Sequence, residues 1–234
     1  MFTKTAAFYD AIYSFKNYQA EAEKLRALIG EKRTAPARSL LDVACGTGLH
    51  LSFLRHHFDV EGLDLDAKLL DVARQRCPGV TFHHADMTAF DLGRKFDVVT
   101  CLFSAIGYAG TVERLDQAVG NMARHLAPNG LLVVEPWLAP QDWRTGVIHA
   151  LFVDRPELKI ARLNHSQARG RLSVIDFHYL VGTPASIDYL TERHELGLFT
   201  REEYLESFRR AGLEVSHDGQ GLMGRGLYFG LLKA

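Results

Sequence analysis

Acidic residues follow short apolar segments at several points of the chain, and the first of them precedes a turn with two glycines. Asp42 lies within the apolar segment 39–44, and Gly46 and Gly48 come just before a predicted helix. Glycine lets a ligand approach the backbone closely. The turn lacks the G-x-G-x-x-G spacing of dinucleotide sites, and an acid upstream disfavours a pyrophosphate at the helix N-terminus. The motif therefore favours a ligand with a positive end.

Two further acids complete the pattern. Asp64 stands 18 residues after Gly46 at the end of the next apolar segment, where a carboxylate can accept both ribose hydroxyls of an adenosine. Asp86 follows the third segment and can accept from an adenine amino group, with Met87 against the ring. Each acid alone is a weak signal, but three successive strand ends meet at one edge of a parallel sheet. We expect a site for S-adenosylmethionine, which carries an ammonium and a sulfonium and no phosphate.

The elements that must position these acids alternate along the first 136 residues. Short apolar segments without strict alternation are separated by helical patterns, which is typical of a parallel sheet buried on both faces. The sequence therefore predicts an α/β, doubly wound, mainly parallel sheet. Its strands are expected at 39–44, 60–65, 80–84, 96–102 and 131–135, and its helices at 8–30, 49–57, 67–76 and 111–126.

The pattern changes after Pro136. Segments 159–164, 171–181 and 189–199 are longer and alternate, which predicts an antiparallel β meander. A helix over 200–211 begins with a Thr200 and Glu203 capping box, and two strands follow at 213–217 and 226–232. We expect residues 1–136 and 196–234 to form the cofactor-binding core, and residues 137–195 to be an inserted substrate-binding or lid region.

Composition limits the remaining possibilities. The chain has 234 residues, 47% of them hydrophobic, with 27 Lys and Arg against 28 Asp and Glu. These values exclude a mainly disordered chain, and they exclude a nucleic-acid partner bound through bulk positive charge. Residues 1–5 lack the apolar run of a signal peptide, and no window approaches a membrane span, so we expect no membrane partner. Three widely spaced cysteines form no disulfide or metal pattern, so a cytoplasmic location is the expectation.

The motifs also resemble a known family. The glycine turn and the acids are similar to the signature positions of class I S-adenosylmethionine-dependent methyltransferases. The resemblance extends to the bacterial enzymes that dimethylate the amino group of dTDP-linked amino sugars, as in desosamine and mycaminose synthesis. The matching positions are 8–13, 41–48, 62–64, 85–87, 103–108, 125–130, 133–137, 164–166 and 224–227.

This resemblance implies a seven-stranded Rossmann-like methyltransferase sheet and N,N-dimethylation of a dTDP-linked deoxy amino sugar in natural-product biosynthesis. The chain departs from the family pattern at Leu49-His50, at Asp64 in place of Glu, at Trp137-Leu138 and near Leu222-Met223. The last two departures fall on the expected sugar-nucleotide pocket. The motifs and the resemblance together predict the following cofactor-binding residues: Tyr18, Asp42, Ala44, Gly46, Gly48, Asp64, Leu65, Asp86, Met87 and Leu102.

The substrate side has fewer signals. A diphosphate requires cations, and Arg225 between two glycines is the best candidate, with a surface turn as the alternative. Trp137 either stacks on the thymine or sugar, or caps the core. His165 and Ser166 could reach the diphosphate, but alternation along a strand should turn one of them outward.

Two residues are candidates for a direct role in catalysis. Tyr13 could offer its hydroxyl to the substrate or simply pack its helix, and Glu135 could meet the amine or be a surface acid. A strong base is optional, since holding a partly neutral amine in line with the methyl group supplies roughly 7–11 kcal/mol. We expect no metal, and we interpret His125 as a helix C-terminal cation.

Alternatives remain open at this point. The chain could methylate another small amine or hydroxyl, or it could be a non-catalytic S-adenosylmethionine-binding regulatory protein. A regulatory scaffold has no need of the roughly 60 residues inserted at the ligand edge, where lids and substrate platforms lie. The sequence does not decide between an amine at C-3 and one at C-4, between one and two methyl groups, or between a monomer and a homodimer.

Overall fold

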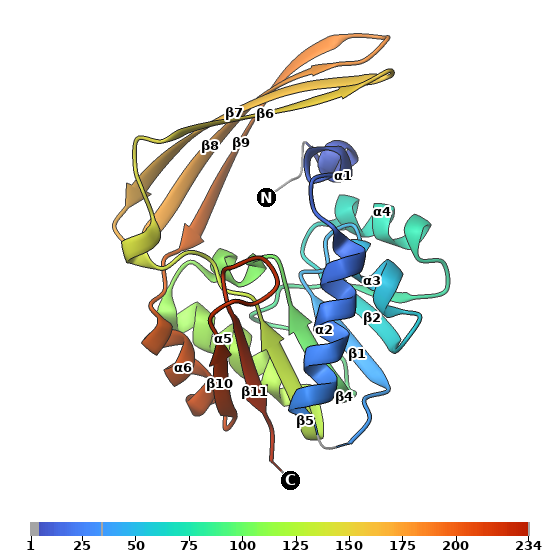
Figure 1. Ribbon diagram of the computed structural model, residues 1–234, viewed down its shortest axis with the longest axis vertical. Coiled ribbons are helices and arrows are strands. Elements are labelled where there is room, and N and C mark those ends of the chain that lie inside the picture. Colours follow the sequence, from blue (N-terminus) through green and yellow to red (C-terminus); the bar gives the residue numbers. More distant parts are fainter. Residues whose placement is uncertain (1–4, 34, 234) are drawn as a thin grey trace.

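The computed structural model describes residues 5–33 and 35–233, which form two β-sheets (Figure 1). Residues 1–4, which carry most of the segment compared with a signal peptide, lie outside the described residues. The larger sheet has seven strands in the order β10-β11-β5-β4-β1-β2-β3. Its strands are β1 (Ser39–Val43), β2 (Asp59–Asp64), β3 (Thr81–His84), β4 (Phe96–Cys101), β5 (Leu126–Val134), β10 (Glu214–Asp218) and β11 (Leu227–Leu231).

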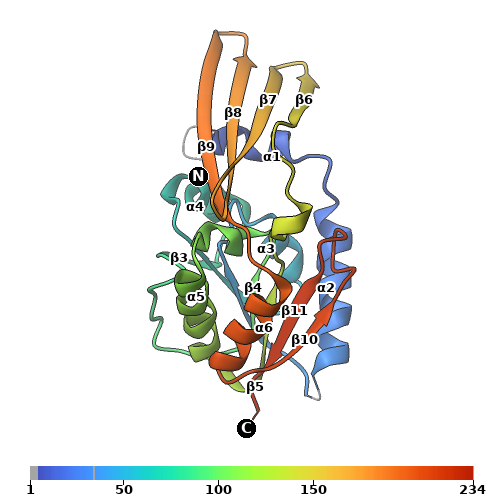
Figure 2. The ribbon, with the colours of Figure 1, turned by 90° about the vertical axis from the view of Figure 1, so that its left-hand side faces the viewer.

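Five strands of this sheet are parallel, and β11 and β10 extend it in antiparallel register. Helices cover both faces, with α5 on one side and α2 on the other (Figure 2). The arrangement confirms the predicted doubly wound sheet. The helical elements are η1 (Ala6–Phe8), α1 (Tyr9–Ile12), α2 (Tyr18–Lys32), α3 (Leu49–Leu54), α4 (Ala67–Arg76), η2 (Ala105–Ala109), α5 (Val112–Arg124), η3 (Pro140–Asp142) and α6 (Arg201–Arg210).

The continuous apolar runs of the central strands follow from burial on both faces. Leu40 packs among the side chains of α2 and α3, whereas its neighbour Leu41 packs among those of α5 and α6. Val98 and Val99 divide in the same way. Because adjacent residues of a strand point to opposite faces, both faces must be apolar, and the period-2 pattern disappears from the sequence.

The second sheet is antiparallel and leans over the carboxyl ends of the parallel strands (Figure 1). It comprises β6 (Ile148–Arg155), β7 (Leu158–Arg169), β8 (Leu172–Gly182) and β9 (Ile187–Gly197) in sequential order. Three of these strands match the predicted meander. The prediction missed β6, an edge strand that exposes Ile148 and Phe152 and so lacks a simple alternation of apolar and polar residues.

The prediction of one helix over residues 8–30 is wrong. Helix α1 ends at Ile12, and α2 begins only after Asn17, whose side chain caps it by accepting from the Ala20 N–H at 3.0 Å. An asparagine at this position satisfies a free helix N–H, so the chain turns instead of continuing. The break lets α1 pack on the inner face of the antiparallel sheet, where Ile12 joins a buried cluster with Phe177 and Tyr179.

Two local predictions can be compared directly with the structure. Thr200 and Glu203 form the predicted capping box at the start of α6. His125 is not a helix C-terminal cation, because it is buried and its ring is held on both sides. Its Nε2 accepts from the Leu92 N–H at 3.0 Å and its Nδ1 donates to the Asn121 carbonyl at 2.8 Å, which is a neutral tautomer. Among the described residues no helix is long and apolar enough to cross a bilayer.

Candidate active site

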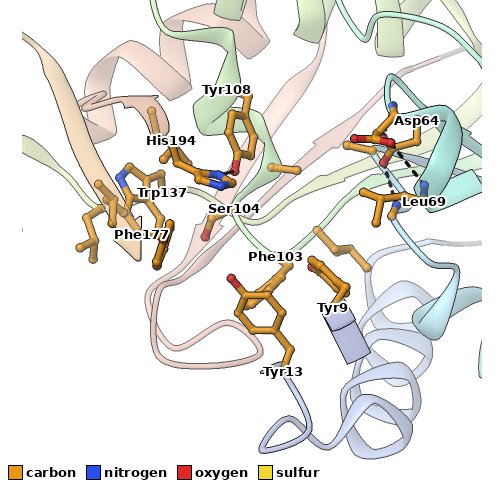
Figure 3. A pocket seen from close by; sticks show the side chains of 18 of the residues that line it. Tyr9, Tyr13, Asp64, Leu69, Phe103, Ser104, Tyr108, Trp137, Phe177 and His194 are labelled. Atoms are coloured by element: carbon orange, nitrogen blue, oxygen red, sulfur yellow. Dashed lines mark hydrogen bonds between the residues drawn. The ribbon is translucent and has the colours of Figure 1, made fainter. Parts of the chain in front are cut away.

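A cavity of about 580 Å³ lies between the two sheets. One wall is formed where β1, β2 and β4 end, at the point where strand order reverses, which is the usual ligand position in such sheets. The inner face of the antiparallel sheet forms the opposite wall, and Tyr9 and Tyr13 approach from the N-terminal segment (Figure 3). Residues of both sheets therefore line a single cavity.

Asp64 is the last residue of β2, and it lines the cavity there. Its side chain is largely buried, and it accepts from the backbone N–H groups of Gly46 and Asp66, both at 2.8 Å. Burial raises the pKa of this carboxyl. The hydrogen bonds fix the carboxylate, and its remaining lone pairs can accept from a ligand. Gly46 stands at φ +57°, in the left-handed region that glycine adopts readily.

Five more of the predicted cofactor residues line the same cavity. Asp86 accepts from the N–H and hydroxyl of Thr88, both at 2.8 Å, which orients its carboxylate. Apolar side chains such as Leu69 and Met87 line the cavity beside these acids, as is usual in ligand sites. The five residues are Ala44, Leu65, Asp86, Met87 and Leu102, of which Ala44 and Leu102 also line the smaller cavity next to it.

A smaller adjoining cavity contains the remaining acid of the motif. Asp42 and Tyr18 line it together with Gly46. Asp42 is buried and accepts from the Thr100 hydroxyl at 2.7 Å, and burial raises its pKa to about 6. The structure does not bring Gly48 to either cavity. That glycine caps α3 at φ +73°, where a Cβ would lie 3.2 Å from the Cβ of Ala73, so packing accounts for it.

The short helix α1 is bound to both halves of the molecule. Asp10 accepts from the Thr47 hydroxyl at 2.8 Å and pairs with Arg76, so it connects α1 to the glycine turn and to α4. At the other end, the backbone and hydroxyl of Thr5 donate to the carboxylate of Glu192 on β9. These contacts hold the N-terminal segment across the cavity between the two sheets.

Arg225 reaches the cavity from the loop before β11. Its guanidinium donates to the Ser104 hydroxyl at 2.9 Å and lies 5.1 Å from the centre of the Trp137 ring. Trp137 itself donates from its indole N–H to the hydroxyl of Ser173 at 2.8 Å. Both predicted substrate residues therefore lie side by side, with a cation and an aromatic face directed into the same space.

Glu135 does not reach the cavity wall. It is fully buried, and its carboxylate accepts from the Phe103 N–H at 2.6 Å. Phe103 and Ser104 have φ values of +51° and +61°, a conformation that costs about 1–2 kcal/mol per non-glycine residue. Glu135 thus stabilises a strained turn that forms the floor of the cavity, and burial raises the pKa of its carboxyl.

Strand β7 presents alternate residues to the cavity. Ser166 faces inward and His165 faces solvent, as alternation requires, so the structure brings only the first of this predicted pair to the site. Asn164 and Arg162 share the inward face, and the sequence prediction missed both. Arg162 lies 4.9 Å from the ring centre of Phe177, and its Nε and Nη1 atoms have no hydrogen-bond partner among the described residues. The period-2 spacing back from Ser166 was the signal that could have found it.

Among residues 5–33 and 35–233, no group of three or more His, Cys, Asp or Glu side chains is arranged to hold a metal ion. The neighbouring histidines His83 and His84 have protein partners: His83 pairs with Glu61, and His84 forms a hydrogen bond with the Leu65 carbonyl. The side chains around the cavity are those of an organic ligand site, with fixed carboxylates at one end and arginines at the other.

Comparison with known proteins gives a consistent result. A family model described as a methyltransferase domain matches residues 40–130. The dTDP-3-amino-3,6-dideoxy-alpha-D-glucopyranose N,N-dimethyltransferase of Streptomyces fradiae is 43% identical and covers 97% of this chain and 90% of its own length. The chain belongs to the family of S-adenosylmethionine-dependent sugar N-methyltransferases.

Solved structures support the same assignment for the methyltransferase. The crystal structure of Streptomyces venezuelae DesVI has a TM-score of 0.92 and 40% identity, covering 99% of both chains. The SAM-bound structure of CalS10, an amino pentose methyltransferase from Micromonospora echinaspora, has a TM-score of 0.86 and 40% identity over 97% of this chain and 95% of that one. These likenesses confirm the predicted fold, the enzyme class and the cofactor.

The departures from the family pattern now have positions in the methyltransferase. Leu138 and Met223 both line the cavity, next to Trp137 and Arg225. Lys16, from the turn between α1 and α2, donates to the Met223 sulfur at 2.8 Å. Two of the four departures therefore lie beside Trp137 and Arg225. The other two lie at the opposite end, where Asp64 lines the same cavity and Leu49 and His50 line the smaller one.

Proposed function

We propose that this enzyme transfers methyl groups from S-adenosylmethionine to the amino group of a dTDP-linked deoxy amino sugar, and does so twice. The observation that supports this most is the single cavity that joins the acids at the strand ends to the arginines opposite. In this proposal residues 1–136 and 196–234 form the cofactor-binding core, and residues 137–195 form the inserted substrate-binding region. Tyr13 and Arg225 of the core also reach the substrate.

The residues present fit the cofactor. Asp64, fixed by two backbone donors, is proposed to accept the ribose hydroxyls, and Asp86 to accept from the adenine amino group. Asp42 and Tyr18, in the smaller cavity, would hold the methionine end, whose ammonium suits a buried carboxylate. When bound, S-adenosylmethionine supplies an electrophilic methyl group.

The opposite wall fits a nucleotide sugar. Arg225, with Arg162 as a second cation, is proposed to bind the diphosphate, because guanidinium groups match phosphate oxygens. Ser166 adds a hydroxyl donor, and Trp137 offers a ring face for the base or the sugar. We assign no substrate contact to His165, which faces solvent.

The catalytic contribution we propose is mainly positional. Tyr13 lies edge-on to Phe103, with ring centres 5.2 Å apart, and it lines the cavity together with Tyr9. These side chains would exclude water and hold the amine in line with the methyl group, which is worth roughly 7–11 kcal/mol. Glu135 is assigned a supporting role, since it fixes the Phe103 turn from below.

A substrate panel tests the proposal. The enzyme is incubated with S-adenosylmethionine and with dTDP-3-amino and dTDP-4-amino deoxy sugars, and product mass is followed for one or two methyl increments. Incorporation into either class supports the proposal and reports the position of the amine and the number of methyl groups. Incorporation only into amines or hydroxyls without a nucleotide would favour the alternative small-molecule methyltransferase. Cofactor binding without transfer to any acceptor would favour a regulatory protein.

The outer face of the antiparallel sheet supports a proposal about assembly. Phe152, Leu180 and Tyr189 are exposed and lie on one cross-strand row that passes through Ala161. Exposed apolar groups of this kind often mark an interface, so we propose a homodimer through this face. Light scattering should give twice the chain mass, and Phe152→Glu should lower it to that of a monomer.

The cysteines support a proposal about location. Cys45, Cys77 and Cys101 are all free thiols in the structure. Free buried thiols are typical of reducing compartments, so we propose that the enzyme works in the cytoplasm. Fractionation of cells that express the chain should recover it with cytoplasmic markers, and recovery with another fraction would contradict the proposal.

A further inference from the structure

A hydroxyl, an imidazole and a carboxylate follow one another along the substrate side of the cavity. The Tyr108 hydroxyl lies 2.5 Å from Nδ1 of His194, and Nε2 of His194 lies 3.8 Å from a carboxylate oxygen of Glu192. Tyr108 and His194 both line the cavity, as Figure 3 shows. Glu192 is buried and is not part of the cavity lining. None of the three belongs to the sites assigned above.

The protonation of this group follows from its surroundings. Burial lowers the pKa of His194 and raises that of Tyr108, so both are neutral near pH 7. A neutral imidazole carries one proton, and the nearby carboxylate of Glu192 favours that proton on Nε2. Nδ1 then carries a lone pair, which accepts the hydrogen bond of the Tyr108 hydroxyl. The oxygen lone pairs of Tyr108 can in turn accept a hydrogen bond from a ligand.

We propose that Tyr108, His194 and Glu192 form a proton relay that removes a proton from the substrate ammonium before each methyl transfer. The proposal rests on the function proposed above, since it requires an amine acceptor. A sugar amine with a pKa near or above neutrality arrives largely as an ammonium, which has no lone pair for attack. A second methylation meets the same obstacle, because the first one leaves a charged nitrogen.

The step balances without any further reactant. One N–H bond of the ammonium breaks and its proton passes to the Tyr108 oxygen, while the original hydroxyl proton moves to Nδ1 of His194. The products are a neutral amine and an imidazolium beside the Glu192 carboxylate. The nitrogen lone pair then attacks the methyl carbon, and the carbon–sulfur bond breaks with its electrons going to sulfur. His194 returns its proton to solvent before the next cycle.

The groups around the relay influence the charge on His194 and hold the relay side chains in place. Arg162 on β7 opposes a charge on His194, whereas Glu192 on its own strand favours it. Phe177 on β8 packs edge-on against the imidazole at 5.1 Å, and Tyr13 and Tyr179 face Tyr108. Glu192 is itself held by Thr5.

The test compares this inner pair with a chemically matched pair on the other face of the same sheet. His178 and Tyr189 form a tyrosine–histidine contact that is exposed and faces away from the cavity. The inner variants are Tyr108→Phe, which removes only a hydroxyl, and His194→Gln. The outer control is His178→Gln, which removes this contact and leaves the apolar row of Phe152, Leu180 and Tyr189 in place. Turnover is measured at saturating substrates from pH 6.5 to 9.5.

We expect the inner variants to lose about 100-fold in kcat at pH 7, which is the lower end of the range for acid–base catalysis. The loss should shrink to a small fraction of that near pH 9.5, where solvent removes the proton instead, and the outer control should match the native chain throughout. A loss that is equal at every pH, or no loss at all, would overturn the relay. A native chain that methylates no amine would refute the proposed function instead.

A second readout needs no cofactor. In protein labelled with ¹⁵N-histidine, the dTDP-amino sugar alone should move the His194 signals towards the imidazolium position, and Tyr108→Phe should prevent that change. His194→Gln identifies the signals. Unchanged His194 signals in the native chain with bound substrate would contradict proton transfer along this route, whatever the activity of the variants.

Discussion

The two walls of the cavity are built in different ways, and we name them the cofactor wall and the substrate wall after the ligands that we propose for them. At the cofactor wall, carboxylates stand where parallel strands end, and backbone donors such as the Gly46 N–H hold them in place. At the substrate wall, side chains project from the middle of long antiparallel strands, and Arg162, Asn164 and Ser166 share one strand face. The first wall is fixed by topology, whereas the second is fixed by which side chains occupy one face of a sheet.

This difference decides how a substitution in either wall should affect ligand binding. Moving a strand end would displace Asp64 and the glycine turn together, so a change there affects binding of any adenosine ligand. A substitution on β7 changes one side chain and leaves the register of the strand intact. We therefore expect cofactor-wall variants to alter cofactor affinity alone, and substrate-wall variants to alter substrate affinity alone.

The largest expected effect is that of Asp64→Ala. Losing two hydrogen bonds between a charged group and the ribose should weaken S-adenosylmethionine by about 3 kcal/mol or more, which is over a hundredfold in Kd. Calorimetry measures it, with Asp64→Asn as a variant that keeps the size of the side chain. Asp71→Ala, at an exposed acid on α4, is the control. An unchanged Kd would refute the assignment of the cofactor wall.

Arg225→Ala should have the next largest effect, and it should act on the substrate instead of the cofactor. Removing one charged partner of a diphosphate should weaken dTDP by about 10- to 100-fold and leave the Kd for S-adenosylmethionine unchanged. Arg209→Ala, at an exposed arginine paired with Glu202, serves as control. If the control weakens dTDP as much as Arg225→Ala does, the interaction is one of general charge and the proposed diphosphate role is wrong.

The pH dependence of cofactor binding should report Asp42. Burial raises its pKa to about 6, so protonation removes its attraction for the cofactor ammonium as pH falls from 7 to 5. Affinity should drop by roughly tenfold, and Asp42→Asn should flatten the profile. Stability should change in the opposite direction: the folded state binds the proton more tightly than the unfolded chain, so the free energy of unfolding falls as pH rises towards 6. Equal pH slopes in the native chain and in Asp42→Asn would contradict this.

The smallest effects should come from the two ends of the N-terminal segment. Asp10→Ala removes a partly exposed ion pair and a hydrogen bond, and should speed cofactor dissociation roughly fivefold. Thr5→Ala removes the hydroxyl contact to Glu192 and should instead affect substrate affinity. Stopped-flow release experiments distinguish the two. The same change from both variants would show that the segment acts as one unit and would weaken the comparison between the walls.

The same contrast explains what the sequence could predict. The acids near the ends of β1 and β2 were visible because each lies in or at the end of an apolar run, and a strand end has a known place in a parallel sheet. Arg162 was missed because a charged residue inside a strand carries no mark that it faces inward, until its neighbours on both strands are known. Glu135 was assigned to the wall on position alone, and only the structure shows its bond to a strained turn.

The prediction of helix boundaries was wrong for a related reason. The apolar spacing of Tyr9, Ile12 and Tyr13 continues into α2, so periodicity joined two helices that belong to different surroundings. What separates them is the asparagine cap and the packing of α1 against the antiparallel sheet, and the second of these is a long-range contact. Patterns that depend on near neighbours predicted well, and those that depend on the other sheet did not.

The four antiparallel strands form an uninterrupted stretch of chain, between β5 and α6, and they pair only with one another in the described structure. If residues 137–195 bind the substrate as we propose, acceptor preference can change in evolution without disturbing the parallel sheet. That stretch can be altered residue by residue while the parallel sheet keeps its own fold. We therefore expect differences in acceptor preference among similar sequences to be concentrated between residues 137 and 195.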